Sequence, residues 1–256
     1  MRPPLRLAAA ALAALCLGGC ATEPRDPEAR AQFRANHDPL EPLNRKTFAF
    51  NQAVDRALIK PIAKGYRAAL PGAARDGLRH FLDNLNEPIV FANTLLQGRV
   101  RDAGDAAGRF LVNSTAGIAG FRDVASHNRL PKKIGDFGQT LWAWGFPEGP
   151  YLIVPILGPT NPRDGIGSGV DAYMDPFRYV TKADHFSTYV TGGRAVLDGI
   201  DKRSRSLDAL DEMEKEAIDY YASFRSLFRQ HRAAELTGSD HPSQLPSPDF
   251  YEDPGR

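Results

Sequence analysis

One apolar segment dominates the middle of the sequence, from Leu141 to Gly158, and Glu148 is its only charged residue. The segment is long enough to cross a bilayer as a single helix. Pro147, Pro150 and Pro155 exclude an unbroken helix, because each removes a backbone donor and clashes with the preceding turn. Such a broken segment belongs either inside a large soluble core or in a membrane-facing hairpin whose backbone groups are satisfied by protein or water.

Apolar residues recur at helical spacing before this segment. A first helix is predicted with Asp38 as its N-cap, Pro39 and Glu41 in its first turn, and Pro61 ending or kinking it. The later patterns predict a helix over residues 72–86, which Asn86-Glu87-Pro88 breaks. A short apolar run over residues 89–96 and a further helix over residues 101–115 follow.

The chain after residue 183 also has a helical pattern. Apolar residues from Leu207 to Phe228 recur at three- and four-residue steps, and charged residues occupy the opposite face. Strands are poorly supported, and the best candidate, Leu152-Ile153-Val154, lies between prolines. We therefore predict an all-α domain over residues 37–236. Residues 237–256 are rich in Pro, Ser and Asp, which predicts a disordered tail.

Residues 1–19 have the pattern of a bacterial export signal. A basic start and the apolar run Leu7–Leu17 are followed by two glycines directly before Cys20. This end resembles the lipobox of bacterial lipoproteins, in which cleavage falls before the Cys and that Cys receives the acyl chains. We therefore predict lipidation of Cys20, and several acyl chains anchor a protein far more strongly than one. Ala21, where inner-membrane lipoproteins of enterobacteria carry Asp, favours the outer membrane.

Residues 20–36 are polar and have no apolar period, which predicts a flexible tether between the lipid and the domain. Cys16 lies in the predicted signal, so Cys20 would be the only Cys of the mature chain, and no internal disulfide or cysteine-based metal site is possible. The formal charge is +1, or −1 without the two arginines of the signal, which gives no electrostatic case for binding nucleic acid.

No catalytic motif stands out. Ser168 is one residue out of frame for a G-x-S-x-G nucleophile elbow, and no phosphate-binding Walker loop is present. The six histidines are scattered, without the spacing of metal ligands. We expect no cofactor and no metal, and we predict that the chain is not an enzyme, although missing motifs alone do not exclude a catalytic triad, which is spatial rather than sequential.

Several segments, in the same order along the chain, together resemble the MlaA/VacJ family of outer-membrane lipoproteins. The resemblance extends from the lipobox to about Arg232. The matching residues are Asp38-Pro39-Leu40-Glu41, Asn44-Arg45, Phe48, Phe50-Asn51, Arg109-Phe110, Asn113, Gly117, Gly120-Phe121, Asp123-Val124-Ala125, Phe137-Gly138, Thr140-Leu141, Gly145, Gly149-Pro150-Tyr151, Pro155, Gly158, Arg163-Asp164, Arg203, Leu207-Asp208, Asp219, Tyr221 and Arg225.

The resemblance implies a disc-like or ring-like helical protein in the inner leaflet of a Gram-negative outer membrane. It further implies a central amphipathic channel and association with a trimeric porin. Such a protein removes mislocalised phospholipid from the outer leaflet and passes it to a soluble periplasmic lipid carrier of the Mla pathway, which maintains lipid asymmetry. The alternative is a structural or adaptor lipoprotein that tethers periplasmic or porin partners and moves no lipid.

The broken segment supplies the candidate site residues. Gly145, Gly149 and Pro150 are expected to form either a hinge that gates the channel or a tight turn in a rigid hairpin. The apolar residues beside them are expected in the channel or membrane wall: Trp142, Trp144, Tyr151 and Leu152. The family motif also singles out one stretch of the first helix, with Asn44, Phe48, Phe50 and Asn51.

Overall fold

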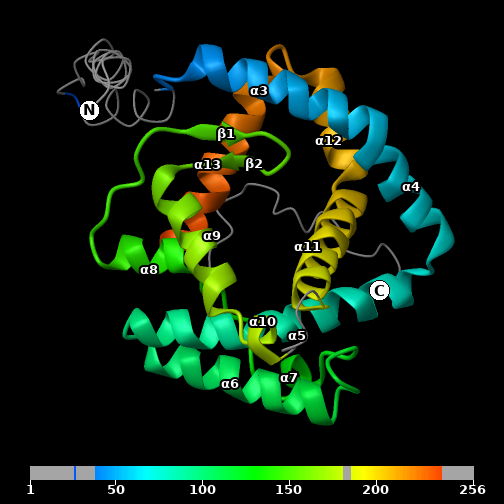
Figure 1. The fold of residues 1–256 in the computed structure, drawn as a ribbon, viewed down its shortest axis with the longest axis vertical. Helices are drawn as coiled ribbons and strands as arrows, with labels where there is room; N and C mark the ends of the chain where they lie inside the picture. Colours follow the sequence, from blue (N-terminus) through cyan, green and yellow to red (C-terminus); the bar gives the residue numbers. More distant parts are fainter. Residues whose placement is uncertain (1–25, 27–37, 181–185, 238–256) are drawn as a thin grey trace.

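Helices arranged around a central opening make up most of the computed structural model (Figure 1). The structure describes residue 26, residues 38–180 and residues 186–237. The predicted signal, Cys20 with its tether and the predicted tail lie outside this part of the chain, apart from residues 26 and 237. The all-α prediction is confirmed, and the helices form a ring.

The first arc of the ring is a continuous helical run of three elements: α3 (Glu41–Val54), the π-helix η1 (Asp55–Ile59) and α4 (Lys60–Ala69). The N-cap prediction is wrong, because Leu40 caps α3 while the Asp38 carboxylate accepts a hydrogen bond from the Leu40 N–H at 3.2 Å. Pro61 does not end the run. A wider π turn directly precedes it and accommodates the missing backbone donor.

The base of the ring is a pair of long helices, α5 (Gly72–Leu96) and α6 (Val100–Thr115). The predicted break at Asn86-Glu87-Pro88 is wrong, since α5 continues through Pro88 and includes the run predicted as separate over 89–96. A proline inside a helix costs about 3 kcal/mol. Packing on both sides of Pro88 offsets this cost, because Ile89 is buried and Glu87 forms a buried ion pair at 2.6 Å with Arg109 of α6.

A short hairpin interrupts the helices that follow, and its strands are antiparallel with Ile153 opposite Pro159. The local sequence pattern offered little support for these strands. Pro159 has no backbone N–H and so cannot donate a hydrogen bond to β1. The strands still pair, because the Ile153 backbone opposite it points away from β2 and its N–H donates to the side chain of Asn44. The elements in this part of the chain are α7 (Val124–His127), α8 (Phe137–Ala143), β1 (Leu152–Val154), β2 (Gly158–Thr160), α9 (Pro162–Met174) and α10 (Phe177–Val180).

The C-terminal helical pattern divides into α11 (Phe186–Arg205), α12 (Leu207–Glu216) and α13 (Tyr220–Thr237). The continuous apolar period did not predict the break between α12 and α13. Ala217 adopts an extended conformation there, and the Asp219 carboxylate accepts a hydrogen bond from the Ala222 N–H at the start of α13. The predicted start at residue 183 lies outside the described residues.

A hydrophobic core cluster lies where α3, the hairpin and α13 meet. Its buried members are Phe48, Tyr151, Ile153 and Tyr221. Many large apolar side chains are exposed instead. Within the described part of the chain, no helix combines the length and the apolar character that crossing a membrane requires.

Candidate functional site

Two asparagines of α3 bind the backbone of the hairpin. The Asn44 side chain donates to the Tyr151 carbonyl and accepts from the Ile153 N–H, both at 2.9 Å. Asn51 repeats this pattern, donating to the Val154 carbonyl at 3.0 Å and accepting from the Ile156 N–H at 2.7 Å. Asn44 and Asn51 are seven residues apart, which is about 10.5 Å along a helix. Their backbone partners are three residues apart, which is about 10 Å along a strand, so the spacing of the two amides matches the spacing of the groups they bind. Helix α3 therefore occupies the free edge of β1.

A second set of contacts joins α3 to α13. Tyr221 donates a hydrogen bond to Asp38, and Arg225 lies 3.4 Å from the same carboxylate. Arg45 binds the Asp219 carboxylate with two nitrogens and lies 4.5 Å from the centre of the Tyr221 ring. Burial and the bond to Asp38 raise the pKa of Tyr221, which therefore stays protonated as a donor. These bonds hold α3, the hairpin and α13 as one unit.

The predicted motif helix has two different faces. Asn44 and Phe48 are buried, and Phe48 packs on the aromatic rings of α13. Asn51 is half-buried against the hairpin, whereas Phe50 points away from this contact and is exposed. The structure thus brings Asn44, Phe48 and Asn51 together and separates Phe50 from them.

The predicted hinge lies in an exposed loop between α8 and β1. Gly145 has a φ of +86°, and a side chain there would meet nothing within 4 Å. Gly149 has a φ of +75°, but a Cβ there would lie 3.0 Å from the ring of Pro162. Pro150 is exposed. Gly145 is therefore free of packing, while Gly149 is held against the start of α9.

The four predicted wall residues do not share one surface. Trp142 and Trp144 are 43% and 51% exposed, and the Trp144 indole N–H donates to the Leu96 carbonyl at 3.2 Å. Tyr151 is only 5% exposed and belongs to the core, while Leu152 is half-buried in β1. The tryptophans thus face away from the core, and Tyr151 fixes the hairpin to it.

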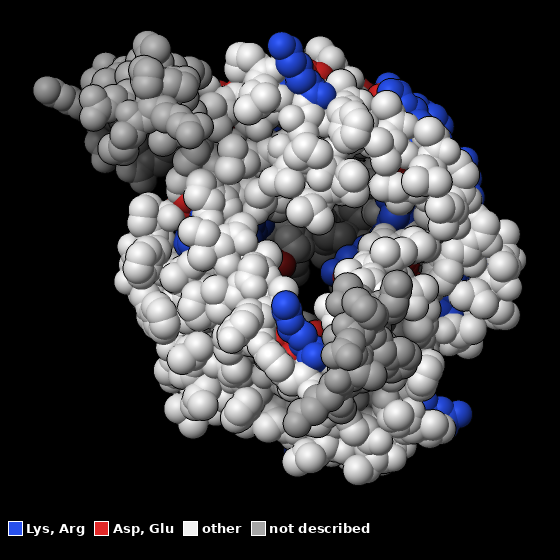
Figure 2. All heavy atoms as spheres, viewed as in Figure 1, with Lys and Arg blue, Asp and Glu red and all other residues white. Residues whose placement is uncertain are grey.

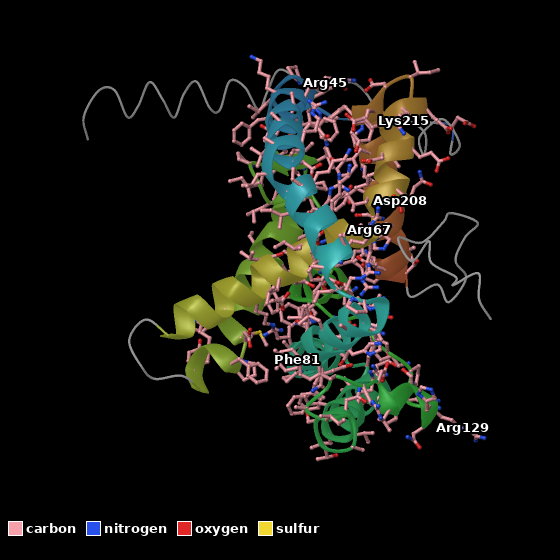
Figure 3. All side chains as sticks on the ribbon, turned by 90° about the vertical axis from the view of Figure 1, so that its right-hand side faces the viewer. Arg45, Arg67, Phe81, Arg129, Asp208 and Lys215 are labelled. Atoms are coloured by element: carbon pink, nitrogen blue, oxygen red, sulfur yellow. The ribbon has the colours of Figure 1, made fainter. Side chains whose placement is uncertain are left out.

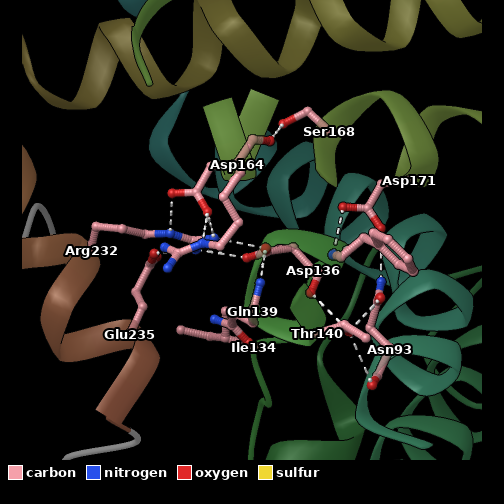
Figure 4. Close-up of polar contacts among 12 residues, drawn as sticks. Asn93, Ile134, Asp136, Gln139, Thr140, Asp164, Ser168, Asp171, Arg232 and Glu235 are labelled. Atoms are coloured by element: carbon pink, nitrogen blue, oxygen red, sulfur yellow. Dashed lines mark hydrogen bonds and ion pairs between the residues drawn. The ribbon is translucent and has the colours of Figure 1, made fainter. Parts of the chain in front are cut away.

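A buried cluster of charges at Arg232 joins α13 to the first turns of α8 and α9 (Figure 4). All three guanidinium nitrogens are bound: they donate to Asp136, the N-cap of α8, to Asp164 in the first turn of α9, and to Glu235, at 2.7 to 3.0 Å. Burial alone would raise the pKa of Asp164, but its hydrogen bonds to Arg232 and Arg163 outweigh burial and hold that pKa below its usual value.

Two glycines make this cluster possible. A Cβ at Gly138 would lie 2.5 Å from an oxygen of Asp164, and a Cβ at Gly167 would lie 2.3 Å from the backbone nitrogen of Gly138. Only glycine lets α8 and α9 approach this closely. Sequence reasoning noted Gly138 and Asp164 as motif residues but missed the cluster, because nothing in the pattern of α13 distinguishes Arg232 from the solvated arginines of that helix.

Exposed large apolar side chains occur on α3, α4, α5, α6, α8, the hairpin turn, α9 and α11, whereas among the described residues none is found on α12 or α13. Charged residues lie on several faces of the molecule. Figure 3 shows Asp208, Lys215 and Arg129 toward one side of the molecule. Figure 2 shows a central opening with Lys, Arg, Asp and Glu side chains at its edge. Among the exposed apolar residues are Leu43, Phe50, Leu58, Phe91, Leu95, Val100, Leu111, Trp142, Trp144, Phe146, Ile156, Leu157 and Ile166.

No group of His, Cys, Asp and Glu residues suited to a metal ion occurs in the described part of the chain. The fold and the site define a class: a helical ring with many exposed apolar side chains and with charged side chains at the edge of its opening. Within that class the chain belongs to the MlaA lipoprotein family, whose family model matches residues 36–235. This membership confirms the resemblance seen in the sequence and agrees with the prediction that the chain is not an enzyme.

Two similar proteins and one solved structure extend the comparison. The chain is 36% identical over 202 residues to a protein of Rickettsia felis, covering 78% of each. It is 33% identical over 231 residues to the "Intermembrane phospholipid transport system lipoprotein MlaA" of Haemophilus influenzae, covering 87% of this chain and 86% of that protein. A solved structure described as "Structural basis for maintenance of bacterial outer membrane lipid asymmetry" matches 78% of this chain and 99% of its own, with a TM-score of 0.69 and 29% identity.

Proposed function

We propose that this chain is an outer-membrane lipoprotein that transports phospholipid between membranes and so maintains outer-membrane lipid asymmetry. The relatives' names support this proposal, and one observation carries it: many large apolar side chains of the ring are exposed, while charged side chains edge its opening (Figure 2). Such a molecule can sit in lipid while it offers a polar passage.

The physical problem of lipid transport explains the value of that arrangement. A phospholipid that changes leaflet must carry its charged head group across hydrocarbon, which is costly. A polar opening shelters the head group, while the acyl chains remain close to apolar surfaces. In our proposal the opening is the channel through which mislocalised phospholipid leaves the outer leaflet.

The proposed position of the protein follows from its two surfaces. The acylated Cys20 anchors it to the inner leaflet on the periplasmic side, and the apolar ring lies in that leaflet. The charged side marked by Asp208 and Lys215 faces the periplasm, where a soluble lipid carrier of the Mla pathway receives the phospholipid. A trimeric porin holds the ring at a fixed depth. The resemblance to the family supports the carrier and porin partners.

The loop between α8 and β1 is the proposed gate of this channel. Gly145 has a left-handed conformation, and a side chain there would meet nothing within 4 Å, so the loop can pivot at this residue. Gly149 and Pro150 lie at its other end, where Gly149 rests on Pro162. The gate therefore has one free end and one held end.

The proposal is tested by reconstitution of the lipidated protein in vesicles together with a trimeric outer-membrane porin. A fluorescent phospholipid is followed as it moves between leaflets, with a quencher that cannot cross the membrane. We expect faster exchange than in vesicles that contain the porin alone. Equal rates in both preparations would contradict transport and favour the adaptor role.

A further inference from the structure

Two arginines of α5 are sheltered from solvent and yet have no counter-charge. Arg75 and Arg79 are both half-buried, and neither forms an ion pair with any residue that the structure describes. Every other buried or half-buried arginine in this part of the chain lies 2.6 to 3.4 Å from an Asp or Glu oxygen. Because sheltered charges in proteins are normally paired, an anion is the partner that these two side chains lack.

The spacing of the pair favours one anion for both arginines. Residues four apart on a helix project from the same face, with about 6 Å between their Cβ atoms. Like charges at this spacing destabilise a helix, and a shared anion removes that repulsion. A group with at least two acceptor oxygens is therefore the best partner for the pair.

The terminal nitrogens of the two side chains are the available donors. Only the Nε atom of each is buried without a partner, and the terminal nitrogens are neither enclosed nor hydrogen-bonded to a described residue. The Nη2 atom of Arg75 lies beside the first turn of α5, 4.0 Å from the position of a Cβ at Gly72. A ligand can reach these terminal nitrogens, and the planar guanidinium group matches the oxygens of a phosphate.

The carboxylates beside the pair already have partners. Asp201 of α11 accepts hydrogen bonds from Tyr66 of α4 at 2.9 Å and from Arg205 at 2.8 Å. Asp76 accepts a hydrogen bond from Arg205 at 3.0 Å. Burial and the bond to Asp201 raise the pKa of Tyr66 to about 12, and the nearby charge of Arg75 opposes this rise. The pair therefore lies at the junction of α4, α5 and α11.

The balance of charge at this junction selects the kind of anion. The pair and Arg205 face only two carboxylates, Asp76 and Asp201, so one positive charge is in excess. A phosphodiester has a single negative charge and balances that excess, whereas a phosphate monoester carries up to about two negative charges at neutral pH. An ammonium group would find both carboxylates occupied. The site therefore favours a phosphodiester and makes no use of a cationic head group.

We propose that Arg75 and Arg79 bind the phosphodiester of a phospholipid, with their terminal nitrogens donating to its two unesterified oxygens. The proposal rests on the proposed transport function and names the residues that recognise the head group of its substrate. Recognition is of the phosphate and not of the alcohol attached to it.

Titration calorimetry on the full lipidated protein in detergent tests this assignment. The main probe is dihexanoylphosphatidylglycerol, whose only charge is its phosphodiester. Dihexanoylglycerol lacks the phosphate and glycerophosphoglycerol lacks the acyl chains, and we expect each to bind at least tenfold more weakly than the main probe. Equal binding of dihexanoylglycerol would overturn recognition of the phosphate. Equal binding of glycerophosphoglycerol would overturn the assignment to a lipid, and no binding of the main probe would overturn both.

Two double variants that remove the same charge provide a matched pair. Arg75→Gln with Arg79→Gln removes the proposed donors, whereas Arg101→Gln with Arg122→Gln removes two exposed arginines that also have no ion pair among the described residues. The first should weaken binding of dihexanoylphosphatidylglycerol at least tenfold, since it removes hydrogen bonds between charged groups, and the second should leave binding unchanged. Circular dichroism checks that both variants are folded. Equal affinities of the two variants would overturn the proposal.

Arg75→Lys with Arg79→Lys keeps both charges and removes the planar donor groups. We expect an affinity between those of the wild type and the Gln variant, because an ammonium group binds phosphate as a point charge. An affinity equal to that of the wild type would overturn the guanidinium contact. These outcomes are separate from the leaflet-exchange assay, since a chain that exchanges lipid but binds phosphatidylglycerol independently of Arg75 and Arg79 contradicts only the assignment of this site.

Discussion

At the scale of single residues, two amide side chains take the place of a neighbouring strand. Asn44 and Asn51 each satisfy one carbonyl and one N–H on the free edge of β1. They differ in burial, since the bonds of Asn44 are buried and the bond from Ile156 to Asn51 is exposed. Unpaired buried backbone groups are costly, whereas exposed ones can bond to water.

The first prediction follows from this difference. Asn44→Leu leaves the Tyr151 carbonyl and the Ile153 N–H unpaired in the core, and we expect it to lower the free energy of unfolding by about 2–4 kcal/mol. Asn51→Leu should cost about 1 kcal/mol, because water reaches its partners. Thermal unfolding in detergent measures both. Equal losses would show that the burial argument is wrong.

The second prediction concerns acid. The pKa of Asp164 is held below its usual value in the folded chain, because Arg232 and Arg163 outweigh burial. Its contribution to stability is therefore present above the unfolded pKa of about 4 and is lost as the pH falls through the folded pKa. Wild type should lose more stability than Asp164→Asn between about pH 5 and about pH 3 in chemical denaturation. Other carboxylates titrate in both proteins, so the difference isolates Asp164. Parallel pH profiles would contradict it.

At the scale of elements, the sequence predicted the helices well and their ends poorly. The break expected at Pro88, and the end or kink expected at Pro61, follow from the local cost of proline, which the sequence displays. The features that accommodate the two prolines do not show in the sequence pattern. They are the π turn before Pro61 and the ion pair between Glu87 of α5 and Arg109 of α6. The strands of the hairpin had little support in the sequence for the same reason, because Asn44 and Asn51 supply its bonds from about a hundred residues away.

In the candidate site, too, the sequence showed local features and missed contacts between distant residues. Gly145 and Gly149 could be selected from the sequence because glycine within two residues of a proline is a local signal, and both have positive φ. The Arg232 cluster could not, because its partners come from three separate helices. Nor could the sequence show that the candidate wall residues have different surroundings, since a turn between Trp144 and Tyr151 separates them.

The third prediction tests the proposed gate with two glycines of matched geometry. Gly145 and Gly98 both have positive φ, and a Cβ at either meets nothing within 4 Å. Gly145→Leu and Gly98→Leu should each cost about 1–2 kcal/mol from backbone strain, with similar protein levels. Only Gly145→Leu should raise outer-leaflet phospholipid in cells. Normal asymmetry in that variant would count against a hinge.

At the scale of the whole molecule, the ring exposes many large apolar side chains, and charged side chains edge its opening (Figure 2). A soluble protein rarely exposes so many large apolar residues, and extended apolar surfaces mark contact with a membrane or another protein. Trp142 and Trp144 are the only tryptophans of the chain, and both are exposed. The protein thus carries its own probe of membrane contact.

The fourth prediction uses that probe. Brominated phospholipids in the vesicle should quench the fluorescence of Trp142 and Trp144, because both rings lie in the membrane in the proposed arrangement. A chain with both tryptophans changed to Phe and with Lys215→Trp on the charged side should not be quenched. Fluorescence that is unaffected in the wild type would place the tryptophans outside the bilayer.

The most direct test of the central claim is the amount of phospholipid in the outer leaflet of the outer membrane after deletion of the gene. We expect phospholipid to accumulate there, sensitivity to detergent to rise, and both to return to normal with the wild-type chain but not with Cys20→Ala. Labelling with palmitate checks that Cys20 carries the anchor in the wild type. A deletion strain whose outer leaflet gains no phospholipid would contradict the claim that this protein maintains lipid asymmetry.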